Sequence, residues 1–264
     1  MHKSLKIILL VVLILTPIIF YKILNQKDSG YQSILPFGNK QKIVDKPAIA
    51  LIFDDFGESL YDLREVYSLG IPLTISILPN LKFSKNIAHI AYRCDFSVFV
   101  HLPMESKEKD YKLGYKFISS DLSKREIKIL LRNYLNSIRI AIGVNNHMGS
   151  QATESLELMQ LVLEEIKKYG LIFVDSRTSS KSVAYEQAQK LGLISGYNEG
   201  FLDYSDNLTD IGKRMEELIK KAQAQGKIIV IAHPRKNTID FLKKNLPSIL
   251  EKVRFITIKD YFEL

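Results

Sequence analysis

The sequence predicts an α/β fold in which seven or eight mainly parallel strands form a closed or nearly closed barrel. Two observations predict it. Short apolar runs alternate with helix-like segments from Pro47 to the C-terminus, and polar residues suited to catalysis recur where these runs end. Strands that alternate with helices imply right-handed βα units and a parallel sheet. An open, doubly wound sheet is the alternative.

Apolar composition and period define the elements in order. The strand-like runs are 48–53, 73–78, 96–100, 140–144, 171–174, 192–195, 228–232 and 253–258. The helix-like runs between the later strands are 123–138, 154–169, 181–191, 208–225 and 237–250. Ser123 and Glu126 have the spacing of a capping box at the start of the first of these helices.

The amino terminus is different in kind. Residues 5–24 are apolar with few exceptions, and Lys3 and Lys6 precede or flank the run, which is typical of a membrane helix that starts in the cytoplasm. We therefore expect a signal anchor over 1–24, a polar linker over 25–46 and one domain over 47–264, outside the cytoplasm. A cleaved signal peptide is the alternative.

Composition excludes several classes of function. The formal charge of +8 comes from lysines and arginines scattered over helical segments, with no basic tract for nucleic acid. The chain has no GxGxxG or Walker motif, so nothing indicates a nucleotide. Its single cysteine, Cys94, excludes an internal disulfide bond.

The chemistry concentrates at the carboxyl ends of the predicted strands. His101, His147 and His233 each follow an apolar run, as do the pair Asp54-Asp55 and the lone Asp175. Carboxyl ends of parallel strands share one face of the fold, and that face carries active sites. Imidazole and carboxylate are ligands for a catalytic divalent metal such as zinc.

Seven ordered blocks then resemble one family. They are IFDDFG at 52–57, SILPN at 76–80, HLPME at 101–105, GVNNHMGS at 143–150, DSRT at 175–178, FLD at 201–203 and AHP at 232–234. In this order they resemble the divergent polysaccharide deacetylases, relatives of the NodB-type carbohydrate esterases. The resemblance implies a NodB-like distorted (β/α) barrel and a Zn²⁺-dependent hydrolase that removes N-acetyl groups from an envelope polysaccharide. The N-terminal anchor would place this domain at the bacterial inner membrane, in the periplasm or otherwise outside the cytoplasm.

The resemblance also implies roles for single residues. Asp54 would be the general base, Asp55 a metal ligand and His233 the general acid. Adjacent residues on an extended strand point opposite ways, so the two aspartates are expected to serve different roles. For Asp55 a helix N-cap is the alternative.

The third metal ligand is open. NodB-type enzymes have a second histidine four residues after the first, where this chain has Glu105. His147 is the preferred substitute, which gives Asp55, His101 and His147 as the ligand set. Glu105 is the alternative ligand and otherwise a substrate-binding residue.

The other polar residues have weaker indications. Asn145 and Asn146 would bind substrate or the developing oxyanion, or else form a turn. Asp175 and Arg177 would orient the base or a histidine, or else form a salt bridge at the rim. Asp203 is a further candidate.

Three hypotheses about function follow. The first is a metal-dependent deacetylase acting on a glycan. The second is a noncatalytic metal-binding envelope protein that supports cell-wall or division machinery, which Glu105 in place of a histidine keeps open. The third is another metal hydrolase such as a phosphoesterase, for which only Arg177 is at hand.

Overall fold

A parallel sheet organises the domain in the computed structural model, which describes residues 46–108 and 116–264. Its strands run in the order β6-β5-β4-β3-β2-β1-β7, and β8 pairs with the first half of β1. The bounds are β1 Ala48–Phe56, β2 Thr74–Ile77, β3 Ser97–Met104, β4 Gly143–Met148, β5 Ile172–Asp175, β6 Ser195–Tyr197, β7 Lys227–Ala232 and β8 Arg254–Ile256. Each of the strand pairs is parallel, as predicted.

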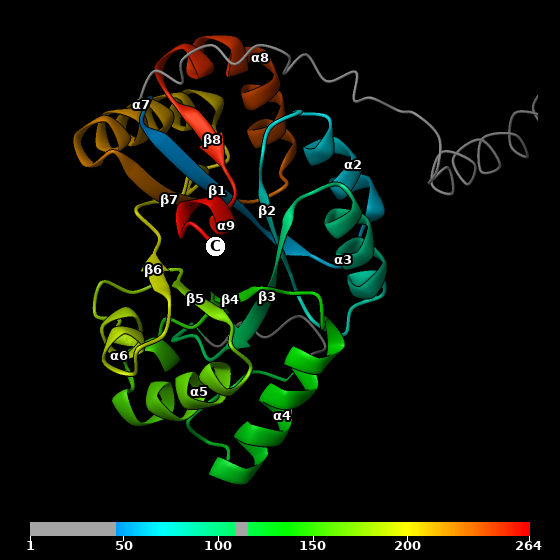
Figure 1. Cartoon of the computed structure of the whole chain (residues 1–264), viewed down its shortest axis with the longest axis vertical. Helices are drawn as coiled ribbons and strands as arrows, with labels where there is room; N and C mark the ends of the chain where they lie inside the picture. The colour runs from blue at the N-terminus through cyan, green and yellow to red at the C-terminus, as the bar shows by residue number, and fades with distance from the viewer. Residues whose placement is uncertain (1–45, 109–115) are drawn as a thin grey trace, which may run out of the picture. The chain divides into compact units, whose positions relative to one another are not determined.

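Helices surround the outside of this sheet, except for the last of them, α9, which lies at one end of the barrel (Figure 1). They are α2 Leu60–Tyr67, α3 Ser84–Arg93, α4 Lys124–Ser137, α5 Leu156–Lys168, α6 Ala184–Lys190, α7 Leu208–Gln225, α8 Lys236–Lys252 and α9 Ile258–Tyr261, with a 3₁₀ turn η1 at Ala152–Glu154. The capping box predicted from Ser123 and Glu126 is present at the start of α4. The predicted alternation of strands and helices is therefore confirmed.

The seven strands β1 to β7 form a nearly closed barrel. The segment after β6 closes the gap to β7: Phe201 pairs with Ile231, and the amides of Glu199 and Leu202 donate to the carbonyls of Ile229 and Ile231 at 2.8 Å each. The open, doubly wound alternative is wrong, because β6 and β7 would then be free edges on opposite sides of a sheet.

Side chains alternate between the two faces of each strand, so the apolar residues form two separate buried clusters. Ala48, Ala50 and Ile52 of β1 lie with Phe99, Val174 and Ile231 in one buried cluster inside the barrel. Their sequence neighbours Ile49, Leu51 and Phe53 lie in the larger cluster between the sheet and the helices. By the same period of two, the inward positions at the carboxyl ends of the strands are those of the polar residues described below.

Two strands are longer than the sequence predicts. β1 continues through Asp54 and Asp55 to Phe56, and β4 begins at Gly143 and continues through Asn145, Asn146 and His147. The polar cluster of β4 was expected after a strand, but it pairs residue by residue with β3, up to Met148 opposite Met104. Backbone pairing thus outweighs the turn propensity of the asparagines.

The opposite end of the barrel is closed by the C-terminal segment. Ile258 of α9 is buried with the interior cluster, and its amide donates to Thr74 Oγ1 at the start of β2 (3.0 Å). Tyr261 and Phe262 pack against the same cluster. The interior is therefore accessible from the carboxyl ends of the strands.

The predicted signal anchor over 1–24 and the predicted linker over 25–46, apart from its last residue Lys46, lie outside the described residues. Within 46–108 and 116–264, no helix combines the length and the apolar character needed to span a bilayer.

We predict that Gly143→Ala destabilises the fold by about 1–3 kcal/mol, the usual cost of overpacking a core. A Cβ at this position would lie 2.3 Å from the Phe99 ring inside the barrel and 3.0 Å from the Ile172 carbonyl. Urea unfolding of the two proteins measures the difference. Gly212→Ala on α7 is the control, because its Cβ would meet only Phe241 at an ordinary 3.4 Å. Equal midpoints for Gly143→Ala and the wild type would contradict this packing.

Candidate metal centre and active site

The carboxyl ends of the strands bring the predicted polar residues together. Asp54, His101 and Asn145 occupy inward positions on β1, β3 and β4, and all three side chains are buried. His147 follows two residues later on β4, and His233 follows β7. A single site therefore collects side chains from four strands.

Asp55 joins this group because its backbone leaves the extended conformation. Its φ is +65°, in the left-handed region, and the register between β1 and β2 shifts between Phe53 and Phe56. Adjacent aspartates were expected to point opposite ways, and this expectation is wrong. Asp54 Oδ2 and Asp55 Oδ1 lie 3.5 and 3.2 Å from the same atom, His101 Nε2.

Asp55, His101 and His147 form a group with the dimensions of a metal site. Asp55 Oδ1 lies 2.9 Å from His147 Nδ1 and 3.2 Å from His101 Nε2, and the two nitrogens are 3.2 Å apart. Ligand atoms on a tetrahedral zinc, at bond lengths near 2.0–2.2 Å, lie roughly 3.3–3.6 Å apart. The spacing of the three atoms is close to that of ligands on one ion.

The lack of a hydrogen bond to Asp55 Oδ1 also suits a metal ion at this position. This oxygen is buried, yet neither neighbouring nitrogen meets the geometry of a hydrogen bond to it. A buried carboxylate oxygen without a hydrogen bond is costly unless a cation compensates it. The three residues could therefore hold a metal ion, and the set contains both donor types that zinc accepts.

Asn145 holds both His101 and Asp54 in place. Its Nδ2 donates to Asp54 Oδ1 and Oδ2 at 2.9 and 3.0 Å, so its Oδ1 is the acceptor that faces His101 Nδ1 at 3.0 Å. Since the oxygen can only accept, His101 Nδ1 carries a proton. In the neutral ring the lone pair is then on Nε2, the atom that faces Asp55 and His147.

The two aspartates are tuned in opposite directions. Burial raises the pKa of Asp54 above its ordinary value, although His101, His233 and the amide of Asn145 partly oppose this. Burial would also raise the pKa of Asp55, but the contacts with His101 and His147 outweigh it and hold the pKa well below the usual range. Asp54 is thus the better proton acceptor and Asp55 the more persistent anion.

His233 lies at the other side of Asp55, with Nε2 3.8 Å from Asp55 Oδ2. Asp203 orients it: Oδ1 faces His233 Nδ1 at 2.9 Å, while Oδ2 accepts from the His233 amide and from Thr238. Burial lowers the pKa of His233, but the hydrogen bond to Asp203 and the charges of Asp55, Asp203 and Asp54 raise it above the ordinary value overall. Phe201 stacks on the ring with 6.0 Å between centroids.

Glu105 and Asn146 have bonding partners outside this group. Glu105 is buried, and its Oε2 accepts from the amide and hydroxyl of Ser120 at 3.0 and 2.9 Å. Asn146 donates to the Met148 carbonyl and accepts from the Ser176 amide. Both side chains tie loops to strand ends, and the roles predicted for them in substrate binding stay predictions.

Asp175 and Arg177 also bond away from Asp54. Asp175 accepts from the Arg177 amide at 2.8 Å and from the Ser182 hydroxyl at 2.7 Å, and burial raises its pKa. The Arg177 guanidinium lies over the Tyr197 ring and 3.7 Å from Glu186. No salt bridge joins Asp175 to Arg177 among the described residues, and their contacts bring neither to the histidines.

Sequence reasoning missed two serines. Ser76 of β2 donates to Asn145 Oδ1, and Ser176 Oγ accepts from Asn145 Nδ2 at 3.2 Å. Both are buried on the inside of the barrel. The available signal was a small polar residue at an inward position next to a strand end, in SILPN and in DSRT.

Comparisons with known proteins agree with this geometry. The model of the divergent polysaccharide deacetylases matches residues 51–262. The Escherichia coli (strain K12) protein YibQ is 31% identical over 209 residues, which are 78% of this chain and 65% of that protein, so the chain spans less than two thirds of this relative.

Solved structures share the fold at low identity. The Agrobacterium tumefaciens C58 protein ATU2773 superposes with a TM-score of 0.76 at 17% identity, over 82% of this chain and 89% of that one. The Bc1960 peptidoglycan N-acetylglucosamine deacetylase has a TM-score of 0.52 at 13% identity, over 83% and 89%. With the family model covering most of the domain, the chain belongs to the divergent polysaccharide deacetylase family.

Proposed function

We propose that this chain is a metal-dependent hydrolase that removes N-acetyl groups from an envelope polysaccharide. One observation carries the proposal: the ligand atoms of Asp55, His101 and His147 lie within 4.8 Å of one another. Asp54 and His233 both lie within 4 Å of members of this group. A base, an acid and three ligands in one place suit the hydrolysis of an amide.

The proposed metal is Zn²⁺, held by Asp55, His101 and His147. Two imidazole nitrogens and one carboxylate oxygen leave a position for water, as catalytic zinc requires. When bound, such an ion supplies Lewis-acid activation of the attacking water and of the acetyl carbonyl.

Asp54 is the proposed general base. It takes a proton from the attacking water, whose oxygen forms the new bond to the carbonyl carbon. Burial raises its pKa and makes it a stronger base than an ordinary aspartate, and Asn145 fixes the direction of both its oxygens. His233 is the proposed general acid: it gives its Nε2 proton to the amide nitrogen as the carbon–nitrogen bond breaks. The products are acetate and the free amine of the sugar.

The cellular setting is part of the proposal. The apolar run over 5–24, with Lys3 before it and Lys6 near its start, supports an anchor in the bacterial inner membrane with the domain on the periplasmic side. The family supports a glycan as the partner. An envelope glycan would be within reach of a domain attached in this way.

The competing proposal is a noncatalytic metal-binding protein of the envelope. Glu105 favours it, because its carboxylate is bound by Ser120 where NodB-type enzymes have a histidine. The two proposals share metal binding and differ in turnover, so the next two experiments separate them.

We predict that His101→Ala and His147→Ala each lower the affinity for Zn²⁺ by more than about 100-fold. Loss of a residue that only hydrogen-bonds a metal ligand lowers metal affinity by about 10–100-fold, and loss of the ligand itself should lower it further. Glu105→Gln should stay within a few-fold of the wild type. Competition with a chelator dye measures the affinity. The control is His89→Ala, which removes an exposed histidine of α3. Affinity that survives loss of His147 but not of Glu105 would transfer the ligand role to Glu105.

We predict that Asp54→Asn keeps Zn²⁺ binding and loses deacetylation, by about a hundred- to ten-thousand-fold, the usual effect of a positioned base. Asn is the same size and can still accept from Asn145, but it cannot take a proton. Acetate release from N-acetylated glycan fragments is the assay. Activity equal to the wild type would exclude Asp54 as the base. A wild type that binds metal but releases no acetate from a broad glycan panel would favour the noncatalytic protein.

A further inference from the structure

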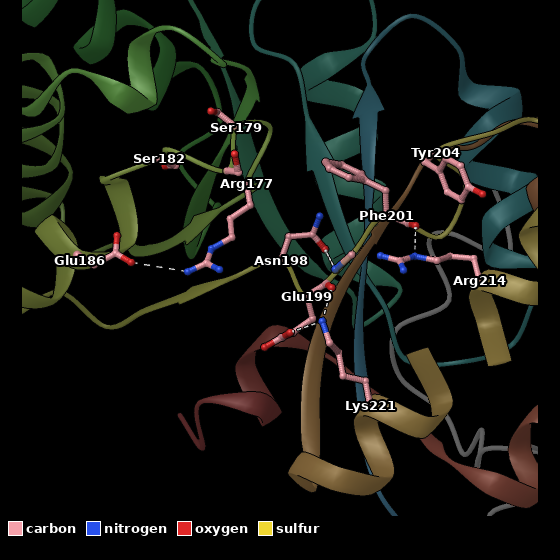
Figure 2. A pocket seen from close by; sticks show the side chains of 12 residues that line it. Arg177, Ser179, Ser182, Glu186, Asn198, Glu199, Phe201, Tyr204, Arg214 and Lys221 are labelled. Atoms are coloured by element: carbon pink, nitrogen blue, oxygen red, sulfur yellow. Dashed lines mark hydrogen bonds and ion pairs between the residues drawn. The ribbon is translucent and has the colours of Figure 1, made fainter. Parts of the chain in front are cut away.

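A hollow adjoins the candidate metal centre. It has a volume of about 480 Å³ and is lined by charged, polar and aromatic side chains (Figure 2). Those used below are Arg177, Asn198, Glu199, Phe201, Arg214 and Lys221. No step of the proposed reaction uses these side chains.

The hollow adjoins the active site through two shared elements. Phe201 lines it and also stacks on the ring of His233, the proposed acid. Asn198 lines it and donates to the carbonyl of Ser176, whose hydroxyl contacts Asn145. A polymer with one unit at the metal centre would therefore place a neighbouring unit in this hollow.

Arg177 is the group in the hollow whose donors remain available. Its guanidinium carbon lies over the Tyr197 ring, 3.8 Å from the centroid. Its one ion pair, with the half-exposed Glu186, is 3.7 Å long, and no hydrogen bond of this side chain occurs in the described part of the chain. The backbone of Arg177 has φ of +50°, a left-handed conformation that is uncommon for residues other than glycine.

The other two cations are already engaged. Arg214 donates to the Phe201 carbonyl at 3.2 Å and to Glu217 at 2.7 Å. Lys221 binds the Glu199 carboxylate at 2.8 Å and its carbonyl at 2.9 Å. Figure 2 shows Arg214 directed at the Phe201 carbonyl and Lys221 directed at Glu199. A new anion would therefore bind at Arg177.

The charge of the lining indicates which anion. Three cations and the two carboxylates of Glu186 and Glu199 line the hollow, a formal sum of +1. A singly charged carboxylate balances this sum, and its two oxygens match the fork of a guanidinium. A doubly charged phosphate would leave excess negative charge next to two glutamates.

We propose that this hollow is a subsite for the carboxylate of an acidic sugar unit next to the N-acetylated one, bound by Arg177. The inference rests on the proposed function, since it places the neighbouring unit of the same glycan. It assigns an acidic polysaccharide as the substrate class.

The test uses two tetrasaccharides that differ in one group. Both contain N-acetylhexosamine, and the neighbouring hexose carries a C6 carboxylate in one and a C6 hydroxymethyl in the other. Calorimetry measures their binding to the full-length Asp54→Asn protein, with and without Zn²⁺, so that neither ligand is consumed. We expect the acidic one to bind about 10–100-fold more tightly, with a smaller difference in high salt.

Variants at Arg177 identify the source of this difference. Arg177→Gln should bring the two affinities within about twofold, and Arg177→Lys, which keeps the charge but not the planar fork, should lose most of the difference. Arg125→Gln removes one charge from the exposed face of α4 and should change nothing. Equal affinities of the two ligands, or a difference that persists in Arg177→Gln, would overturn the subsite.

Acetate release by the wild type keeps the two proposals apart. Preferential binding of the acidic ligand without acetate release would remove the proposed deacetylation and keep the subsite. Acetate release from both ligands at equal affinity would keep the deacetylation and remove the subsite. An equal loss of affinity for both ligands in Arg177→Gln would make Arg177 a structural residue and also overturn the proposal.

Discussion

The site depends on the side-chain amide of Asn145. This buried group contacts Asp54 of β1, Ser76 of β2, His101 of β3 and Ser176 after β5, so one residue of β4 links groups from four other segments of the barrel. Its nitrogen faces carboxylate oxygens and its oxygen faces a ring nitrogen and a hydroxyl. A reversed amide would leave several buried groups unsatisfied, at a cost of about 1–3 kcal/mol each. The orientation of the proposed base and the tautomer of His101 therefore follow from one hydrogen-bond network.

The same network leaves a charge problem that a cation would resolve. Two adjacent carboxylates, Asp54 and Asp55, lie within 3.5 Å of a single imidazole nitrogen. Like charges this close oppose each other, and burial opposes both. The pKa of Asp54 is raised and that of Asp55 is lowered, so the fold assigns the persistent negative charge to the residue that faces two histidines. A divalent ion among Asp55, His101 and His147 would stabilise that charge and leave Asp54 available to accept a proton.

Much of this arrangement could be predicted because a strand alternates with a period of two. The carboxyl ends of the strands share one face, and this accounts for the positions of Asp54, His101, Asn145, His147 and His233. The position of Asp55 could not be predicted, since it depends on a left-handed backbone at a shift in register. Asp175 follows Val174, an inward residue, so alternation directs its side chain outward to the loop before α6. The partner of Glu105 depends on the contact between Met104 and Ile118, which local sequence does not encode.

The seam between β6 and β7 explains where the hollow proposed for a neighbouring sugar lies, because the segment after β6 contributes part of its lining. β6 has three residues, and the loop after it, rather than a full strand, completes the pairing with β7. Phe201 lies on that loop and pairs with Ile231, and Ile231 is two residues before His233 in the sequence. Its ring therefore has one face against the proposed acid and belongs to the wall of the adjoining hollow. A longer β6 would continue the sheet through this region, so the incomplete closure of the barrel leaves Phe201 between His233 and the hollow that Arg177 lines.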